Sequence, residues 1–329
     1  MMREVARKQQ SEHGHISVLL AEVLGFLAPR PGGRYLDGTL GLGGHAEAIL
    51  DLAGQGAELL GLDRDAVALE RARARLDRFG GAARLVQAPY SDFEAEMDAL
   101  GWDLLDGALL DLGVSSIQLD TADRGFSFLS DGPLDMRMDP GSGAAPASQI
   151  VNKASAERLK EIIRDLGEEP MAGRIARAIV EARQDREIET TLELAAIVER
   201  AYPAKWRRTA RNHPATRTFQ ALRMAVNREL EELEAFLARI TDRLRIGGRV
   251  AIISFHSLED RLVKRAFREE AKDCSCPRTQ MVCDCSGPKL RLLTKKPVTP
   301  SEEEMAGNPR SRSAKLRAAE RVERRGARS

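Results

Sequence analysis

The sequence has no run of about 18 or more uncharged apolar residues, so it predicts no transmembrane helix. Its first residues, MMREVARKQQSEHGH, also lack the apolar stretch of a signal peptide. The chain nevertheless has 329 residues and 43% apolar composition, which is enough to bury a substantial core. We therefore expect a globular, cytoplasmic protein with one large domain or two smaller ones.

The chain has little net charge, +1 by formal count, but its two parts have opposite signs. Residues 1–150 contain 13 Lys and Arg against 23 Asp and Glu, whereas the remainder contains 38 against 27. Arg200–Arg217 has six basic residues and no acid, and Met305–Ser329 has eight basic residues against two acids. Both stretches are candidates to face phosphates, although solvated Arg-rich helix faces would give the same pattern. Aromatic residues within the first stretch favour RNA, because they can stack on unpaired bases.

Short apolar strands alternate with helices in the first third of the chain. Nearly all-apolar strands separated by helices indicate parallel strands that are buried on both faces. We therefore predict an α/β fold with a doubly wound, mostly parallel sheet, which binds its ligand at the carboxyl ends of the strands. The first strands are expected at Gly33–Asp37, Glu58–Asp63, Arg84–Gln87 and Asp106–Asp111.

The alternation stops after about Asp120, and only helical patterns follow as far as residue 213. We predict that residues 121–213 form an inserted all-helical domain that contacts the substrate. Residues 1–120 and 214–329 would then form the cofactor-binding domain. The second part is expected to contain one long helix and three further strands, at Thr216–Leu244, Arg249–Ser254, Lys289–Thr294 and Lys315–Ala319.

A glycine-rich segment, DGTLGLGGH at residues 37–45, occupies the first strand-to-helix turn. Glycine there lets the backbone approach a ligand that any Cβ would block. Asp63 ends the second strand, where a carboxylate can accept hydrogen bonds from both ribose hydroxyls of an adenosine. The loop and Asp63 together predict a nucleoside cofactor without identifying it.

The glycine spacing fits two cofactor classes and also a purely structural turn. Gly41-x-Gly43-x-x-Ala46 satisfies the dinucleotide pattern, so a nicotinamide-dependent (NAD) oxidoreductase is one alternative. Asp37 favours a methyltransferase, because an acid suits a cationic amino-acid ligand and is unfavourable beside a pyrophosphate. His45 at the helix start and the basic second half of the chain also weaken the dinucleotide interpretation.

Longer motifs resemble the bacterial 16S rRNA cytosine-N4 methyltransferase family, from His15 to about Arg321. They are DLGVSSIQLD (111–120), RGFSF (124–128), DGPLDMRMD (131–139), RIARAI (174–179), HPATRTFQ (213–220), ISFHSLEDR (253–261) and NPRSRS (308–313). The resemblance implies a class I methyltransferase, Rossmann-like fold and S-adenosyl-L-methionine as cofactor. It also implies methylation of the N4 amine of a cytidine in the decoding region of 16S rRNA, on the 30S ribosomal subunit. A non-catalytic RNA-binding protein on the same fold is a further alternative.

The resemblance also implies which residues contact the cofactor. The family more often has Phe at the position of Tyr90, and Tyr90 considered alone could equally be a core aromatic. The expected contacts are Gly43, Gly44 and His45 at the methionine end, Asp63 at the ribose, Tyr90 at the adenine, and Asp111 and Gln118 after the fourth strand.

The N4 amine of cytosine is a poor nucleophile because its lone pair is delocalised into the ring, so positioning must supply most of the rate. Asp111, Ser115 and Ser116 are candidates to orient the amine, and no strong general base is expected. Asp111 could equally bind only the cofactor. Other amino-methyltransferases have two prolines and an aromatic after this acid or its equivalent, and this sequence lacks them.

The target base must be unpaired or splayed out of the folded RNA to reach the pocket. Arg208, His213 and Arg217 are expected along the RNA path, and His256 and Ser257 at the mouth of the pocket. His213 precedes a proline, and a simple packing role is its alternative.

The chain has only four cysteines, and they lie within twelve residues: Cys274, Cys276, Cys283 and Cys285. Disulfides would be unusual in a cytosolic protein. Structural zinc is one interpretation, but C-x-C pairs are less diagnostic than C-x-x-C pairs, so the absence of any metal is the other. The sequence leaves the oligomeric state open.

Overall fold

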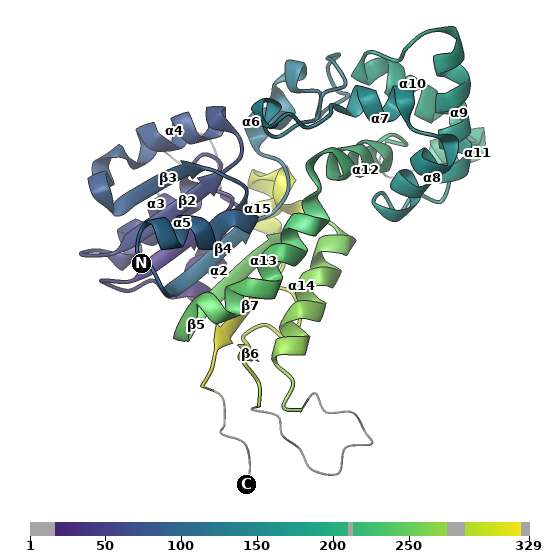
Figure 1. Ribbon diagram of the computed structural model, residues 1–329. Helices are drawn as coiled ribbons and strands as arrows, with labels where there is room; N and C mark the ends of the chain where they lie inside the picture. The colour runs from purple at the N-terminus through teal and green to yellow at the C-terminus, as the bar shows by residue number, and fades with distance from the viewer. Residues whose placement is uncertain (1–16, 210–212, 275–286, 324–329) are drawn as a thin grey trace. The chain divides into compact units, whose positions relative to one another are not determined.

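The computed structural model describes residues 17–209, 213–274 and 287–323 (Figure 1). The chain divides into two compact units. The sheet unit comprises Met1–Gly113 with Glu231–Ser329, and the helical unit comprises Val114–Leu230. Within the described residues, no helix is both long and apolar enough to cross a membrane.

In the described part of the chain, seven strands form one sheet in the order β3-β2-β1-β4-β5-β7-β6. The pairs from β3 to β5 are parallel, and β7 pairs antiparallel with both β5 and β6. The predicted doubly wound, mostly parallel sheet is therefore confirmed. Both late strands are present, but only β6 lies at the edge, because β7 pairs with a strand on each side. The strands are β1 (Arg34–Asp37), β2 (Glu58–Asp63), β3 (Ala83–Gln87), β4 (Leu105–Asp111), β5 (Leu244–Ser254), β6 (Leu290–Leu292) and β7 (Lys315–Arg321).

Helices cover both faces of this sheet. Successive residues of its strands point to opposite faces, so the apolar side chains on each face need a covering layer. In β4, Leu109 packs into one core cluster, and Ala108 and Leu110 pack into the other. The helices of the first face are α2 (Leu20–Leu27), α3 (Gly44–Ala53) and α4 (Ala66–Leu76). Those of the second are α5 (Phe93–Ala99), α13 (Glu229–Arg243) and α14 (Ser257–Glu270).

The prediction of one long helix over Thr216–Leu244 is wrong. Two helices, α12 (Thr216–Asn227) and α13, occupy this range, and β5 already begins at Leu244. The break is at Arg228, whose backbone is left-handed with φ 52° and ψ 40°. A left-handed residue cannot continue a right-handed helix, so α12 ends there.

The helical unit extends further than the predicted range 121–213. Phe219 and Leu222 of α12 are buried in the same cluster as Ile175 and Leu194, so α12 belongs to this unit. Its other helices are α6 (Ser116–Asp120), α7 (Ala147–Lys153), α8 (Ala156–Asp165), α9 (Ala172–Asp185), α10 (Thr191–Ala201) and α11 (Ala204–Thr209).

Short segments complete the described chain. They are α15 (Glu302–Gly307) and the 3₁₀ turns η1 (Asp77–Ala82), η2 (Tyr90–Asp92), η3 (Ala122–Arg124), η4 (Pro140–Ser142) and η5 (Pro309–Ser313).

Candidate functional site

Three aspartates end neighbouring strands at the carboxyl edge of the sheet unit. Asp37 ends β1, Asp63 ends β2 and Asp111 ends β4. Strand β1 pairs with both of the others in parallel, so the three carboxyl ends meet at one edge. This is the edge at which open α/β sheets bind their ligands.

The glycine turn between β1 and α3 packs tightly against the protein's own side chains. A Cβ on Gly44 would lie 2.2 Å from the Ser17 hydroxyl, and a Cβ on Gly38 would lie 2.5 Å from a methyl carbon of Leu110. Gly43 has φ 76°, a left-handed conformation that favours glycine. Close packing within the protein therefore already requires these glycines, before any ligand is considered.

Asp63 holds the glycine turn in place. One carboxylate oxygen accepts a hydrogen bond from the Gly41 N–H at 2.7 Å, and the other accepts from the Asp65 N–H at 2.8 Å. Burial raises the pKa of Asp63 to about 6, although these two backbone donors act in the opposite direction. Asp63, at the end of β2, is thus hydrogen-bonded directly to the glycine turn that follows β1.

Asp37 is almost fully buried, with 1% of its surface exposed. Its Oδ1 accepts a hydrogen bond from the Thr39 N–H at 3.2 Å, whereas its Oδ2 has no hydrogen-bond partner among the described residues. Burial raises the pKa of Asp37 to about 7, His45 lowers it, and the charges of Asp111 and Asp63 raise it further. This carboxyl is therefore poised to ionise when a cation approaches.

His45 and Asp111 face each other beside Asp37. The His45 Nε2 lies 3.5 Å from Asp111 Oδ2, and the Asp111 N–H donates to the Thr39 hydroxyl at 2.6 Å. Both ring nitrogens of His45 and Asp111 Oδ1 are buried without a hydrogen-bond partner in the described chain. Buried polar atoms are nearly always satisfied, so this group requires partners that a ligand or water can supply.

Tyr90 begins η2 directly after β3. Its ring meets Phe236 of α13 edge-on, with centroids 5.9 Å apart and an interplanar angle of 84°. Tyr90 is only partly buried. It therefore packs against the core on one side and keeps some exposed surface.

Ser115, Ser116 and Gln118 belong to the helical unit. Ser115 and Gln118 form a capping box at the start of α6: the Ser115 N–H donates to the Gln118 side chain at 3.0 Å, and the Gln118 N–H donates to the Ser115 hydroxyl at 3.3 Å. Ser116 is the first residue of the helix. The pattern S-x-x-Q from Ser115 to Gln118 is the sequence signal for such a cap.

His213 and Arg217 also lie in the helical unit and contact neighbouring parts of it. The His213 ring packs on Phe128 with centroids 4.8 Å apart, and its Nδ1 accepts from the Ala215 N–H at 3.2 Å. Arg217 donates to the Glu168 carbonyl at 3.1 Å, and both predicted side chains are exposed. Arg208 lies in α11, and its side chain is outside the described residues.

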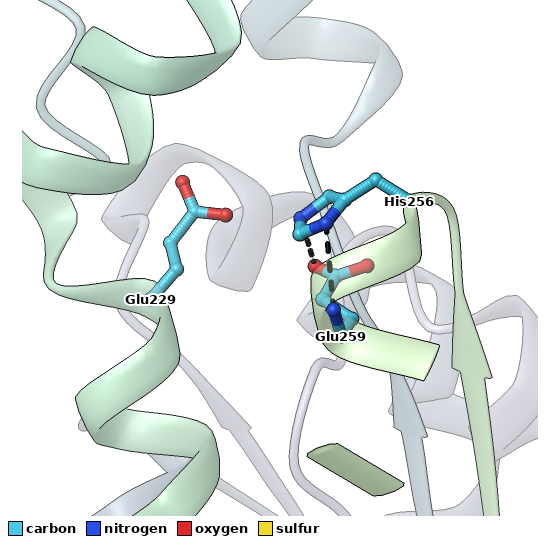
Figure 2. Close-up of side chains that lie close together, drawn as sticks. All are labelled: Glu229, His256 and Glu259. Atoms are coloured by element: carbon cyan, nitrogen blue, oxygen red, sulfur yellow. Dashed lines mark hydrogen bonds and ion pairs between the residues drawn. The ribbon is translucent and has the colours of Figure 1, made fainter. Parts of the chain in front are cut away.

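His256 and Ser257 are at the start of α14, where His256 caps the helix. The imidazole of His256 faces the carboxylate of Glu259, with Nε2 and Oε1 3.1 Å apart (Figure 2). The Glu259 N–H donates to His256 Nδ1 at 3.4 Å, and the Phe255 N–H donates to the Glu259 carboxylate at 2.9 Å. His256 is partly buried in this arrangement, whereas Ser257 is exposed.

The cysteine prediction is not tested by the structure. Cys274 is exposed, and Cys276, Cys283 and Cys285 lie outside the described residues. Structural zinc at these positions remains a prediction.

Glu304 on α15 was not singled out from the sequence, yet it lies close to the glycine turn. Its carboxylate accepts a hydrogen bond from the Leu19 N–H at 2.7 Å. Burial raises the pKa of Glu304, and the nearby His45 lowers it. The only local signal is S-x-x-E at Ser301, which predicts a helix cap, and the Ser301 hydroxyl does accept from the Glu304 N–H at 3.1 Å.

Comparisons with known proteins give a consistent family. The family model described as the MraW methylase family matches residues 12–322. A protein of Nitratidesulfovibrio vulgaris (strain DP4) named "Ribosomal RNA small subunit methyltransferase H" is 64% identical over 94% of this chain and 95% of its own length. The protein of the same name from Maridesulfovibrio salexigens is 60% identical over 96% of this chain and 98% of its own length.

A solved structure, an rRNA methylase from Streptococcus thermophilus, is 10% identical, with a TM-score of 0.41 over 94% of this chain and 99% of its own. No conclusion depends on that distant likeness. The family match covers nearly the whole sequence, and the nicotinamide-dependent alternative is set aside because of it. This chain belongs to the MraW methylase family.

Proposed function

We propose that this protein transfers a methyl group from S-adenosyl-L-methionine to the exocyclic N4 amine of a cytidine in 16S rRNA. The target lies in the decoding region of the small (30S) ribosomal subunit, and the enzyme acts in the cytoplasm. The family membership and the names of the relatives support an rRNA methyltransferase. The structural observation that carries the proposal is the group of buried, unpartnered polar atoms at the carboxyl edge of the sheet.

The residues at this edge fit S-adenosyl-L-methionine. The cofactor supplies an electrophilic methyl group on a sulfonium and carries an ammonium, a carboxylate and an adenosine. Asp37 Oδ2 and Asp111 Oδ1 lack partners, and each is suited to accept a hydrogen bond from a cationic group. His45, which also lacks partners, is suited to donate to a carboxylate. Gly43 and Gly44 would contact this end of the cofactor through their backbone, since a Cβ on either would meet the protein's own side chains.

Asp63 and Tyr90 would hold the nucleoside. The Asp63 carboxylate accepts hydrogen bonds from the backbone N–H groups of Gly41, Asp65 and Arg64. An ionised carboxylate has about four lone-pair directions, so it can also accept from the ribose. The exposed part of the Tyr90 ring would lie against the adenine. Gln118 would add a further contact to the cofactor.

Asp111 is the best-supported candidate to orient the target amine or the cofactor. Its Oδ1 is available in the described structure, whereas the Ser115 hydroxyl already accepts a hydrogen bond in the α6 cap. Ser116 is a further candidate as the first residue of α6. No strong general base is required, because holding the amine in line with the methyl group supplies most of the rate.

The helical unit would bind the RNA, and Arg208, His213 and Arg217 would lie along the bound RNA. His256 and Ser257 would contribute at the pocket mouth. The exposed positions of His213, Arg217 and Ser257 are compatible with this role. Most of the proposed cofactor contacts belong to the sheet unit.

Methyl transfer from isotopically labelled S-adenosyl-L-methionine tests the proposal, with naked 16S rRNA and assembled 30S subunits as parallel substrates. Digestion of the product to nucleosides should place the label in N4-methylcytidine. Label in another nucleoside would refute the assigned target. Cofactor binding without any transfer to either substrate would favour a non-catalytic RNA-binding protein.

A further inference from the structure

A basic hollow lies between α14 and the β7–β6 edge of the sheet unit. In the strand order, β5 separates this edge from β4 and the other strands whose ends carry the cofactor candidates. Four of its seven lining residues are Lys or Arg, and two, Phe267 and Leu292, are apolar. Its lining consists of Lys264, Phe267, Arg268, Leu292, Thr294, Lys295 and Arg317.

The spacing of basic residues extends this charge along α14. Arg261, Lys264, Arg265 and Arg268 are separated by steps of three, one and three residues. Positions at i, i+3, i+4 and i+7 share one face of an α-helix, so the four side chains form a stripe two turns long. Lys295, on the segment after β6, adds an exposed cation at the hollow.

The acids near the hollow are already engaged with other cations. Asp260 forms an ion pair with Arg317, at 2.7 Å and 3.2 Å, and lies 4.0 Å from Lys315. At the far end of α14, Glu269 pairs with Lys272 at 2.5 Å, and Glu270 lies 3.6 Å from Lys289. The charge of Arg317 is therefore largely compensated inside the protein.

The other three cations of the lining are not compensated within the described residues. Lys264, Arg268 and Lys295 have no ion pair or hydrogen bond within the parts of the chain that the structure describes, and Lys264 is half-buried. Like charges gathered around one concave surface raise its positive potential and attract an anion. Phosphate is the anion that neighbouring Lys and Arg side chains bind most effectively.

We propose that this basic hollow binds phosphates of the rRNA backbone, as a second contact remote from the methyl-transfer site. The proposal rests on the proposed function for its choice of RNA. A stripe of cations two helical turns long suits a chain of phosphates, whereas a single small anion would use the hollow alone. Lys and Arg side chains that contact phosphates add binding affinity but do not distinguish one base sequence from another. This surface would therefore strengthen rRNA binding without selecting the target cytidine.

The test compares two triple variants of the full chain that remove the same number of charges. In the first, Lys264→Gln, Arg268→Gln and Lys295→Gln neutralise the hollow. In the matched control, Arg71→Gln, Arg73→Gln and Arg84→Gln neutralise exposed cations on α4 and β3. Binding of a 16S rRNA transcript is measured by fluorescence anisotropy from 50 to 300 mM salt, and cofactor binding by calorimetry.

The hollow variant should bind the transcript about tenfold or more weakly, and the slope of log affinity against log salt should fall by about two to three. The control should change both quantities much less, and cofactor affinity should stay unchanged in both variants. Lys264→Arg with Lys295→Arg should retain wild-type binding, because phosphate contacts depend on charge. The single variant Lys295→Gln should lower the slope of log affinity against log salt by about one. Lys295 is exposed, so this variant should fold like the wild type.

Equal affinity and slope in the wild type and the hollow variant would overturn the proposal, as would an equal loss in the α4 and β3 control. Failure of the proposed function gives a different result. In that case, the wild type would bind the transcript through this surface but transfer no methyl group to 16S rRNA or 30S subunits.

Discussion

The carboxylate of Glu304 accepts a hydrogen bond from the Leu19 N–H at 2.7 Å, although 285 residues separate the two in sequence. Leu19 has a left-handed backbone, with φ 51° and ψ 34°, at the start of α2. Two residues earlier, the Ser17 hydroxyl packs where a Cβ on Gly44 would be. Glu304 therefore fixes the segment that forms one wall of the glycine turn.

Glu304→Ala should weaken S-adenosyl-L-methionine binding several-fold. The Leu19 N–H would lose its partner, and the stability loss should be about 1 kcal/mol, as for a typical buried hydrogen bond. Calorimetric titration and urea unfolding measure the two effects. Glu303→Ala, an exposed position on the same helix, is the control. Unchanged cofactor affinity in Glu304→Ala would show that residues 17–19 do not shape the site.

Asp63→Asn should lower cofactor affinity by about tenfold or more, because hydrogen bonds to a charged group contribute about 1.5–3 kcal/mol. Asparagine also has only one acceptor oxygen for the backbone N–H groups that the two oxygens of Asp63 now bind. Asp77→Asn, at an exposed position after α4, should leave affinity unchanged. Wild-type affinity in Asp63→Asn would remove Asp63 from the cofactor site.

Asp37 should make stability and cofactor binding depend on pH in opposite directions. Its folded pKa of about 7 exceeds the ordinary value, so the folded protein holds this proton more tightly than the unfolded chain. The contribution of Asp37 to the free energy of unfolding is fully present below about pH 4 and is lost as the pH rises through about 7. Affinity for the cationic cofactor should rise over pH 6–8, because only the ionised carboxylate attracts it.

Asp37→Asn tests both consequences. Urea unfolding of the cofactor-free protein at pH 5 and pH 8 should show a smaller loss of stability in the variant than in the wild type. Calorimetry should show proton release on cofactor binding near pH 7 in the wild type and less release in the variant. Asp63, with a pKa of about 6, contributes to both proteins alike. Identical pH profiles would mean that Asp37 does not titrate in this range.

Asp111→Asn and Ser115→Ala separate the two candidates for orienting the amine. Asp111→Asn should lower kcat about a hundredfold if it positions the amine, and should raise only the KM for the cofactor if it binds that molecule alone. Ser115→Ala should cost about 1 kcal/mol of stability through the lost α6 cap and leave kcat near wild type. Single-turnover kinetics provides the measurement. Wild-type rates in both variants would exclude both side chains.

Arg228→Gly should stabilise the helical unit by about 0.5–1 kcal/mol. A left-handed conformation costs a non-glycine residue about 1–2 kcal/mol, and glycine avoids this but gains entropy when unfolded. The control Ala225→Gly, inside α12, should instead destabilise the protein by about 1 kcal/mol. Thermal or urea unfolding measures both changes in stability. A loss of stability in Arg228→Gly would contradict the prediction.

Sequence patterns predicted the sheet because its signals are local. The strands of residues 34–111 are continuous apolar runs ending in Asp37, Asp63 and Asp111, and each was predicted to within about one residue. The break at Arg228 carried no local signal, since arginine is a good helix former and the apolar spacing continues on both sides. The boundary of the helical unit at Leu230 was missed for the same reason, because α12 is assigned to its unit by packing partners alone.

The site was predicted unevenly. Its strand-end acids follow from the rule that ligands bind at the carboxyl ends of parallel strands. No local pattern indicated that His45 and Asp111 would lie 3.5 Å apart, or that the Glu304 carboxylate would bind the Leu19 N–H. The stripe on α14 follows from its spacing in the sequence. The lack of an ion pair for Lys264 and Arg268 among the described residues does not, because ion pairs join residues that are distant in the chain.

Local patterns in the sequence specify the family, the alternation of strands and helices, and the acids at the strand ends, because each depends on neighbouring residues. Tertiary packing determines the rest: which of those acids are buried without hydrogen-bond partners among the described residues, which glycines make room for side chains of the protein itself, and which lysine and arginine side chains of α14 lack an ion pair there. These outcomes depend on contacts between segments far apart in the chain, which no local pattern specifies.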